Sequence, residues 1–140
     1  MNRLSLILFV SIFVLLFTGC SSDSPRDVVE KSLKCRMKND VKGFASCIYF
    51  PGGEDGRKYY IERREKLLNQ HPDRVRTVEN FEILDEDVDD SKGQAKVTVR
   101  IKLSGSDYNY NVEWPIELVR NKNRWWIASY DHIALNIFTI

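Results

Sequence analysis

The chain has 140 residues, with 21 basic and 20 acidic side chains and a formal net charge of +1. Because phosphate binding requires a basic excess on one face, this balance argues against a nucleic acid as a partner. The length predicts a single domain, large enough to bury most of its chain surface in one core.

Residues 1–19 have the pattern of a targeting signal. Arg3 supplies a positive charge, and an apolar run from Leu4 to Phe17 follows, interrupted only by Ser5 and Ser11. This run is shorter than the roughly 20 apolar residues of a spanning helix. It also lies where a secretory signal lies, so we interpret it as a signal peptide.

The apolar run ends on Thr18-Gly19-Cys20, which resembles the bacterial lipobox, where a peptidase cuts just before a lipidated cysteine. The usual consensus has Leu three residues before the cysteine, whereas this chain has Phe17 there and Leu16 one residue earlier. The Cys20 thiol would take a diacylglyceryl group, and two or more acyl chains such as palmitate anchor a protein stably. An ordinary secretory signal with a chance cysteine and an uncleaved anchor helix are the alternatives.

This interpretation divides the chain into a signal peptide (1–19), a lipidated tether (20–24) and one domain (25–140). It predicts a lipoprotein of the bacterial cell envelope, held to the membrane through Cys20 and facing the periplasm from the outer membrane in a Gram-negative cell. Two further cysteines, Cys35 and Cys47, would then lie outside the cytoplasm, where a pair is often bridged. A disulfide and two buried free thiols are both open readings.

Helical spacing dominates the first half of the domain. Ser24 and Pro25 predict a helix start, with Asp27 in the first turn where an acid is favoured. A second helix is expected from Val41 to about Ile48, and a third from about 56 to 69, before His71-Pro72. The apolar stripes of these helices are expected at Val28, Val29, Leu33, Arg36 and Met37; at Phe44, Cys47 and Ile48; and at Tyr60, Ile61, Arg64, Leu67 and Leu68.

From Val75 onward the apolar period changes from about 3.6 to 2, which predicts strands. The clearest alternation runs from Ala95 to Leu103, with Lys96, Arg100 and Lys102 on the other face, where they could pair with Glu113 and Glu117. Further strands are expected around 81–83, 108–118 and 124–130. The prediction is an α+β domain in which three helices cover a curved antiparallel sheet of four strands, or five if the tail adds one.

This order resembles the nuclear transport factor 2-like, or cystatin-like, fold. Residues 24–29, 38–40 and 125–127 (Ser-Pro-Arg-Asp-Val-Val, Lys-Asn-Asp and Trp-Trp-Ile) resemble short motifs of small bacterial lipoproteins that carry a domain of unknown function of this fold. The resemblance covers about residues 24–132. It implies a sheet wrapped round a helix to form a cone with a pocket, and a fold that hosts isomerases, dehydratases and many non-enzymes.

Few residues suggest catalysis or metal binding. The acidic run 85–90 lacks the Gly and Glu of a calcium loop, so a solvated hairpin end is expected. His71 and His132 are the only histidines, with no metal-ligand spacing, and we predict neither a metal nor a cofactor. Asp131 next to His132 could orient a general base, although a surface turn is the simpler interpretation.

Aromatic residues and one cation form the candidate pocket, which could stack a ring and hold an anion. The members are Tyr60, Arg64, Tyr110, Trp114, Trp125, Tyr130 and His132. A filled aromatic core is the alternative. The apolar tail 133–140 could complete the cone, add an edge strand or serve in association.

The leading functional hypothesis is a non-catalytic, membrane-anchored module that binds a ligand or a protein. A small lyase or isomerase using Asp131 and His132, and a structural accessory of an envelope complex, are the alternatives. An open cone with polar atoms inside would favour ligand binding or catalysis over a structural role.

Overall fold

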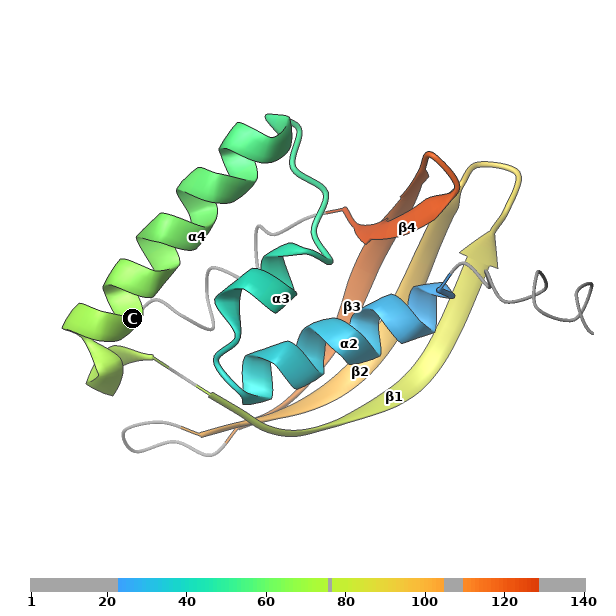
Figure 1. Cartoon of the computed structure of the whole chain (residues 1–140). Coiled ribbons are helices and arrows are strands. Elements are labelled where there is room, and N and C mark those ends of the chain that lie inside the picture. Colours follow the sequence, from blue (N-terminus) through green and yellow to red (C-terminus); the bar gives the residue numbers. More distant parts are fainter. Residues whose placement is uncertain (1–22, 76, 105–109, 129–140) are drawn as a thin grey trace, which may run out of the picture.

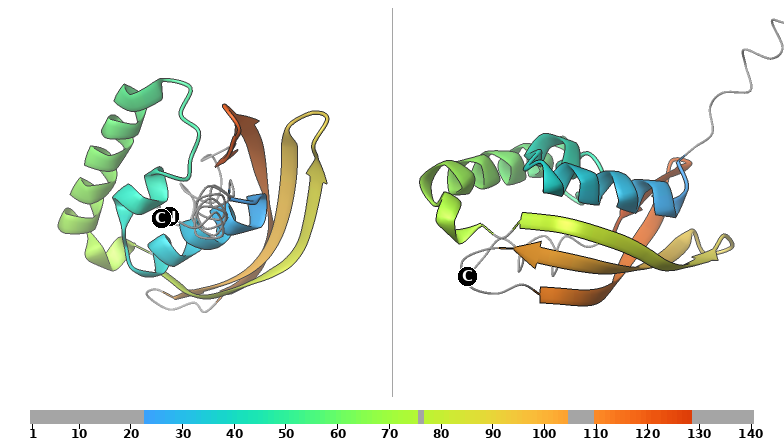
Figure 2. Two further views of the ribbon diagram at one scale, coloured as in Figure 1. Left: turned by 45° about the vertical axis from the view of Figure 1, so that its right-hand side comes forward. Right: turned by 90° about the horizontal axis from the view of Figure 1, so that it is seen from below.

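The computed structural model describes residues 23–75, 77–104 and 110–128, and in them three helices precede a curled antiparallel sheet, which confirms the predicted α+β, cone-like fold. Helices α2 and α3 lie across the concave face of the sheet, while α4 lies beyond them, farther from the strands (Figures 1 and 2). The elements are α2 (Pro25–Met37), α3 (Val41–Ala45), α4 (Gly53–Gln70), the 3-10 turn η1 (Pro72–Arg74), β1 (Thr77–Asp89), β2 (Gln94–Ser104), β3 (Tyr110–Asn121) and β4 (Arg124–Ile127).

The sheet is a meander in the order β1-β2-β3-β4, with every pair antiparallel. Central residues of β2 face the helices: Val97 and Val99 are fully buried, and Val99 lies between Ile83 of β1 and Trp114 of β3. The predicted alternation therefore sets the register, because a shift by one residue would turn these valines to solvent. The short β3–β4 turn has positive φ at Lys122 and Asn123, the twist-compatible geometry of a tight hairpin.

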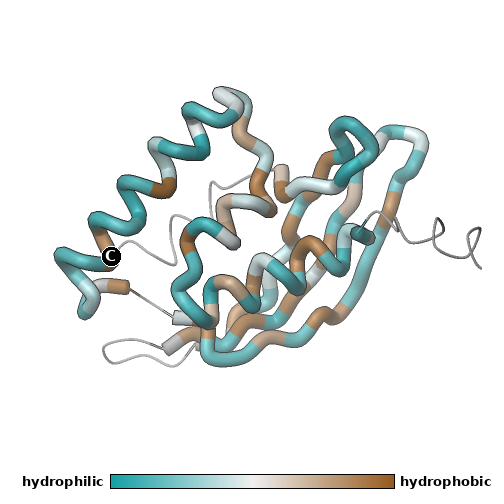
Figure 3. The backbone as a smooth tube through the Cα atoms, in the orientation of Figure 1, coloured by the Kyte–Doolittle hydropathy of each residue, from teal (hydrophilic) through white to brown (hydrophobic). Residues whose placement is uncertain are grey.

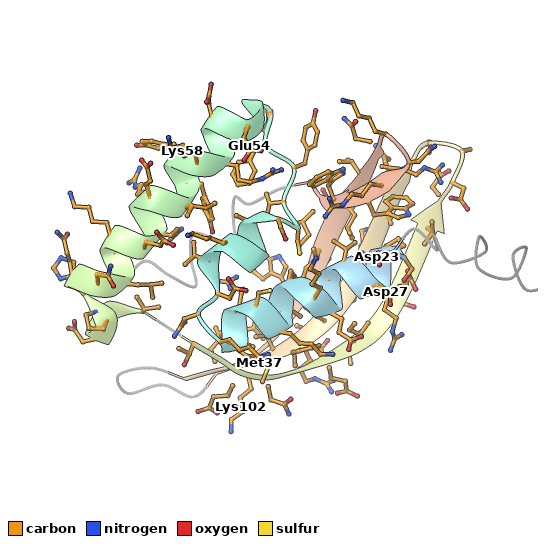
Figure 4. The ribbon with its side chains drawn as sticks, in the orientation of Figure 1. Asp23, Asp27, Met37, Glu54, Lys58 and Lys102 are labelled. Atoms are coloured by element: carbon orange, nitrogen blue, oxygen red, sulfur yellow. The ribbon has the colours of Figure 1, made fainter. Side chains whose placement is uncertain are left out.

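The convex face of the sheet is polar and carries ion pairs. Arg100 contacts Glu113 at 2.6 Å and Glu82 at 2.9 Å, and Lys102 contacts Glu79 at 3.0 Å. The predicted pairing of Arg100 with Glu113 is confirmed. Lys102 (Figure 4) instead reaches the opposite neighbour, β1, because that strand also presents acids on this face.

Helix α2 begins as predicted, with a reciprocal cap. The Ser24 side chain accepts a hydrogen bond from the Asp27 backbone N–H at 3.2 Å, and the Asp27 carboxylate accepts one from the Ser24 backbone N–H at 3.0 Å. Val29 and Leu33 are fully buried against the sheet. Met37, expected on the same stripe, is 40% exposed because the helix ends there and the chain turns toward α3.

Helix α3 is shorter than predicted and ends at Ala45. The next residues leave the helix to pair with β4: Ile48 forms a parallel bridge with Ile127, whose N–H donates to the Cys47 carbonyl at 2.9 Å. Pairing across the fold thus overrides the local helical pattern. Helix α4 starts at Gly53, which has φ of +62°, earlier than the predicted residue 56.

Helix α4 differs from α2 in composition. Figure 3 shows it as mostly hydrophilic, and among its residues only Tyr60 and Arg64 are buried. Within the described part of the chain, no helix is long and apolar enough to cross a membrane. The predicted signal and Cys20 lie outside the described residues, as do Asp131 and the tail 133–140.

Candidate functional site

Two buried arginines from different helices meet where α2, α3 and α4 converge. Arg36 lies near the end of α2 and is 2% exposed, and Arg64 lies on α4 and is 6% exposed. Tyr60 lies one turn before Arg64 on the same face of α4 and is also buried. Arginine is seldom fully buried, so two buried arginines close to each other make this region a candidate functional site.

Aromatic rings flank both guanidinium groups. The Arg36 Cζ lies 4.8 Å from the ring centroid of Phe44 on α3, and the Arg64 Cζ lies 5.5 Å from that of Tyr60. Phe50 extends this wall, because its ring centroid is 5.5 Å from that of Tyr60. Cation–π contacts orient the guanidinium planes without neutralising their charge.

Electrostatics make this cluster, Arg36, Tyr60 and Arg64, a concentration of positive charge. Burial, together with the neighbouring charge of Arg64 and against the effect of Tyr60, lowers the pKa of Arg36 to about 9. Arg36 is therefore still a cation at neutral pH. Burial also raises the pKa of Tyr60, which keeps its phenol protonated and able to donate a hydrogen bond.

The cluster lines two adjoining hollows that share Tyr60, Arg64 and Leu67. The inner hollow is only about 10 Å³, the space of one water molecule, and contains Arg36 and Phe44 in its wall. The outer groove is about 750 Å³, within the size range of ligand pockets. Its wall combines apolar surface with cations: Phe50, Pro51, Gly52, Gly56, Tyr59, Tyr60, Arg63, Arg64, Lys66, Leu67, Gln70 and His71.

A stack of side chains fixes the start of α4 against the sheet. The Trp126 ring of β4 has Arg124 at 4.1 Å and Arg57 of α4 at 5.6 Å, measured from Cζ to the ring centroid. Arg124 also donates to the Ser46 carbonyl at 3.1 Å, and Arg57 contacts Glu54 at 2.8 Å. This stack positions the groove wall relative to the strands.

Three of the aromatic residues predicted to share a pocket belong to one hydrophobic core, in which Tyr60 and Trp125 are buried and against which Trp114 packs, partly buried. Tyr60 also contacts Arg64 and lines the groove with it. Tyr110 lies on β3, while Tyr130 and His132 lie outside the described residues. Sequence reasoning did not single out Arg36. The sequence does place Arg36 on the apolar stripe of α2, and a cation on the buried face of a helix is itself expected to be buried.

His71 is the C-cap residue of α4 and also lies in the groove wall. The acidic run closes the β1–β2 hairpin, where the Asp89 carboxylate accepts from the Ser91 hydroxyl and the Lys92 N–H. Within residues 23–75, 77–104 and 110–128, no three potential metal-ligating residues come together. Cys35 and Cys47 are free thiols.

Comparisons with known proteins identify the fold. No family model matches the chain, and no curated protein matches it in sequence. It is similar in structure to a Campylobacter jejuni protein described as an "NTF2-like transpeptidase", with a TM-score of 0.53 and 15% sequence identity over 76% of this chain and 99% of that one. At this identity the likeness shows an NTF2-like fold and carries no activity with it.

Proposed function

We propose that this protein is a non-catalytic binding module of the bacterial envelope, and that the cluster of Arg36, Tyr60 and Arg64 receives the anionic group of a small organic ligand. The single observation that carries this proposal is the burial of two guanidinium groups at adjoining hollows, Arg64 in the wall of the amphipathic groove and Arg36 in the wall of the inner hollow. Carboxylates are the ligand class that best fits a guanidinium fork and a phenol donor.

The physical argument is one of charge. Two like charges in a desolvated place oppose each other, and an entering anion would stabilise both at once. Perturbed pKa values in a hollow are typical of functional sites. The remaining wall, with Phe50 and Leu67, would hold an apolar or aromatic body beside the anion.

Binding is favoured over group transfer by the state of the thiols. The structural neighbour's description names a transpeptidase, and covalent peptide transfer commonly uses an activated nucleophile. Desolvation raises the pKa of both Cys35 and Cys47, which reduces the thiolate fraction at neutral pH. Neither thiol lines the groove or the inner hollow.

Anchoring through Cys20 would hold the groove away from the membrane. The tether 20–24 spans at most about 18 Å when extended, so it keeps the start of α2 near the lipid surface. That start lies beside the β1–β2 hairpin, since the Arg26 N–H donates to the Glu86 carboxylate at 3.2 Å. Helix α4 lies at the opposite end of α2 (Figures 1 and 2).

Calorimetric titration tests the site with 4-phenylbutyrate and its neutral counterpart 4-phenylbutanol. We expect the carboxylate to bind and Arg64→Met to weaken it about tenfold or more, because a charge-assisted hydrogen bond contributes roughly 1.5–3 kcal/mol. Lys58→Met is the matched control: Lys58 is an exposed cation of the same helix, outside the groove wall (Figure 4). Equal binding of acid and alcohol, or equal losses in both variants, would contradict the proposal.

Mass spectrometry of the mature N-terminus tests the anchor. We expect the parent protein to begin at Cys20 with a diacylglyceryl adduct and to fractionate with membranes, and Cys20→Ser to lose both properties. A parent protein without lipid would remove the envelope-lipoprotein part of the proposal and leave the binding part standing.

A further inference from the structure

Both cysteines of the domain border the same residue, Gly43 of α3. Cys47 lies in the turn that follows α3, with its Sγ 3.6 Å from the Gly43 carbonyl oxygen. The Cys35 thiol approaches from α2, with Sγ 2.7 Å from the place where a Cβ on Gly43 would lie. One thiol therefore comes from α2 and the other from the turn after α3, and both lie near the backbone of Gly43.

Gly43 is the residue that permits this convergence. A real Cβ almost never approaches another heavy atom within 3.0 Å, so any side chain at position 43 would displace the Cys35 sulfur. The same missing Cβ leaves room for the Asp40 carboxylate, which accepts from the Gly43 N–H at 2.9 Å and caps α3. Glycine in a helix is otherwise unfavourable, and its presence here leaves room first for the capping carboxylate of Asp40, the nearest group, and then for the Cys35 sulfur of α2.

We propose that Cys35 and Cys47 form a reversible disulfide that fastens α2 to the turn after α3. Helix α2 contributes Arg36 to the wall of the inner hollow and α3 contributes Val41 and Phe44, yet the disulfide is independent of what the hollow binds.

The difference in exposure between the thiols sets the order of the reaction. Cys35 is partly exposed, whereas Cys47 is 2% exposed. A small disulfide such as glutathione disulfide is the oxidant: the Cys35 thiolate attacks one of its sulfurs and expels one glutathione thiolate. The Cys47 thiolate then attacks the Cys35 sulfur of the mixed disulfide and expels the second. Two protein thiols are oxidised and one glutathione disulfide is reduced, and the two protons that the protein thiols lose pass to the two expelled glutathione thiolates, which leave as two glutathiones.

Peptide mapping of the full-length protein in detergent tests the proposal directly. The protein is treated with glutathione disulfide, quenched with acid and cut after glutamate. The segment 31–54 lies between Glu30 and Glu54, contains no other glutamate and carries both thiols, while Cys20 falls on another peptide. We expect this peptide to lose the mass of two hydrogens and to carry no glutathione. A peptide that keeps both thiols, or that carries glutathione without ring closure, would overturn the proposal.

Two serine variants test the order of attack. We expect Cys47→Ser to stop at the mixed disulfide, with one glutathione on Cys35, and Cys35→Ser to remain unmodified while folded. Glutathione uptake at equal rates in both variants would contradict the assigned order.

Thermal unfolding of each protein, reduced and oxidised, is the second readout. The midpoint should rise on oxidation only in the parent, because only there is the unfolded chain constrained. An unchanged parent midpoint would show that α2 is not fastened to the turn after α3.

Discussion

The two ends of this domain use helices in opposite ways. Helix α2 places Val29 and Leu33, both fully buried, against the equally buried Val97 and Val99 of the sheet. Helix α4 is hydrophilic along most of its length and buries a phenol and a guanidinium. Helix α2 therefore packs an apolar core against the sheet, whereas α4 contributes a buried charged side chain, Arg64, to the walls of the two hollows.

This difference separates stability from function. Apolar burial contributes about 25 cal/mol per Å², so the apolar side chains buried between α2 and the sheet stabilise the fold. Buried cations contribute little to folding and often oppose it. We therefore expect substitutions in the α2–sheet core to unfold the protein, and substitutions in the arginine cluster to change binding.

The largest effect is expected in the centre of β2. Ile101→Ala should lower the free energy of unfolding by about 2–4 kcal/mol, because it removes a fully buried side chain and leaves a cavity. Leu68→Ala, on the partly buried face of α4, should cost about 1 kcal/mol or less. Urea denaturation measures both. Equal losses of stability in the two variants would show that α4 is packed as firmly as the sheet, and would contradict the difference drawn between α2 and α4.

Arg64→Met should separate the two properties within one variant. Carboxylate affinity should fall about tenfold, or about 1.4 kcal/mol, whereas the free energy of unfolding should change by less than that. Methionine keeps the apolar stem and removes the charge that opposes Arg36. Calorimetry and urea denaturation on the same preparation decide the matter. A loss of stability larger than the loss of affinity would assign Arg64 a structural role.

Ser24→Ala should lower the free energy of unfolding by about 1 kcal/mol, because it removes the α2 cap. Backbone and side-chain hydrogen bonds from Ser24 lower the pKa of Asp27 from its usual 3.8. A carboxyl with a lowered folded-state pKa stabilises the fold above its unfolded pKa, and this contribution is lost as the pH falls through the folded value. The difference between Ser24→Ala and parent should therefore shrink below pH of about 4 in denaturation series. A constant difference would exclude the reciprocal cap as its cause.

The smallest effect is expected on the convex face. Arg100→Ala should change stability by about half a kcal/mol or less, because its two ion pairs are exposed to solvent. Raising the salt concentration should reduce even this difference. Denaturation at low and high salt checks it. A loss comparable to that of Ile101→Ala would mean that the two faces of β2 are misassigned.

The sheet and the start of α2 could be predicted from sequence because local chemistry decides them. Val97, Val99 and Ile101 alternate with polar residues, and the Ser24-Pro25 pair with Asp27 is a helix start that needs no distant partner. The end of α3 could not be predicted in this way. The last turn predicted for α3 does not form, because Ile48 instead forms a β-bridge with Ile127, a residue far away in the sequence.

The site was only half predictable. Arg64 is conspicuous as a cation on an otherwise apolar stripe, and Tyr60 accompanies it. Arg36 lies on the apolar stripe of another helix, α2. The two guanidinium groups come together only in the folded protein, where α3 packs against both α2 and α4. Trp114 and Trp125 have aromatic side chains of the kind that line pockets, yet the alternation of their strands turns them toward the core. Tyr130 and His132 lie outside the described residues, and their part in a pocket stays a prediction.

The central claim, an anion site built by Arg36 and Arg64, is tested most directly by NMR of the arginine side chains. The Nε–H resonances of the protein are followed while 4-phenylbutyrate is added, with 4-phenylbutanol as the control and Arg36→Met and Arg64→Met as assignment variants. We expect the resonances of Arg36 and Arg64 to shift together and saturate with the acid alone. Shifts confined to exposed arginines, or equal shifts with the alcohol, would contradict the account.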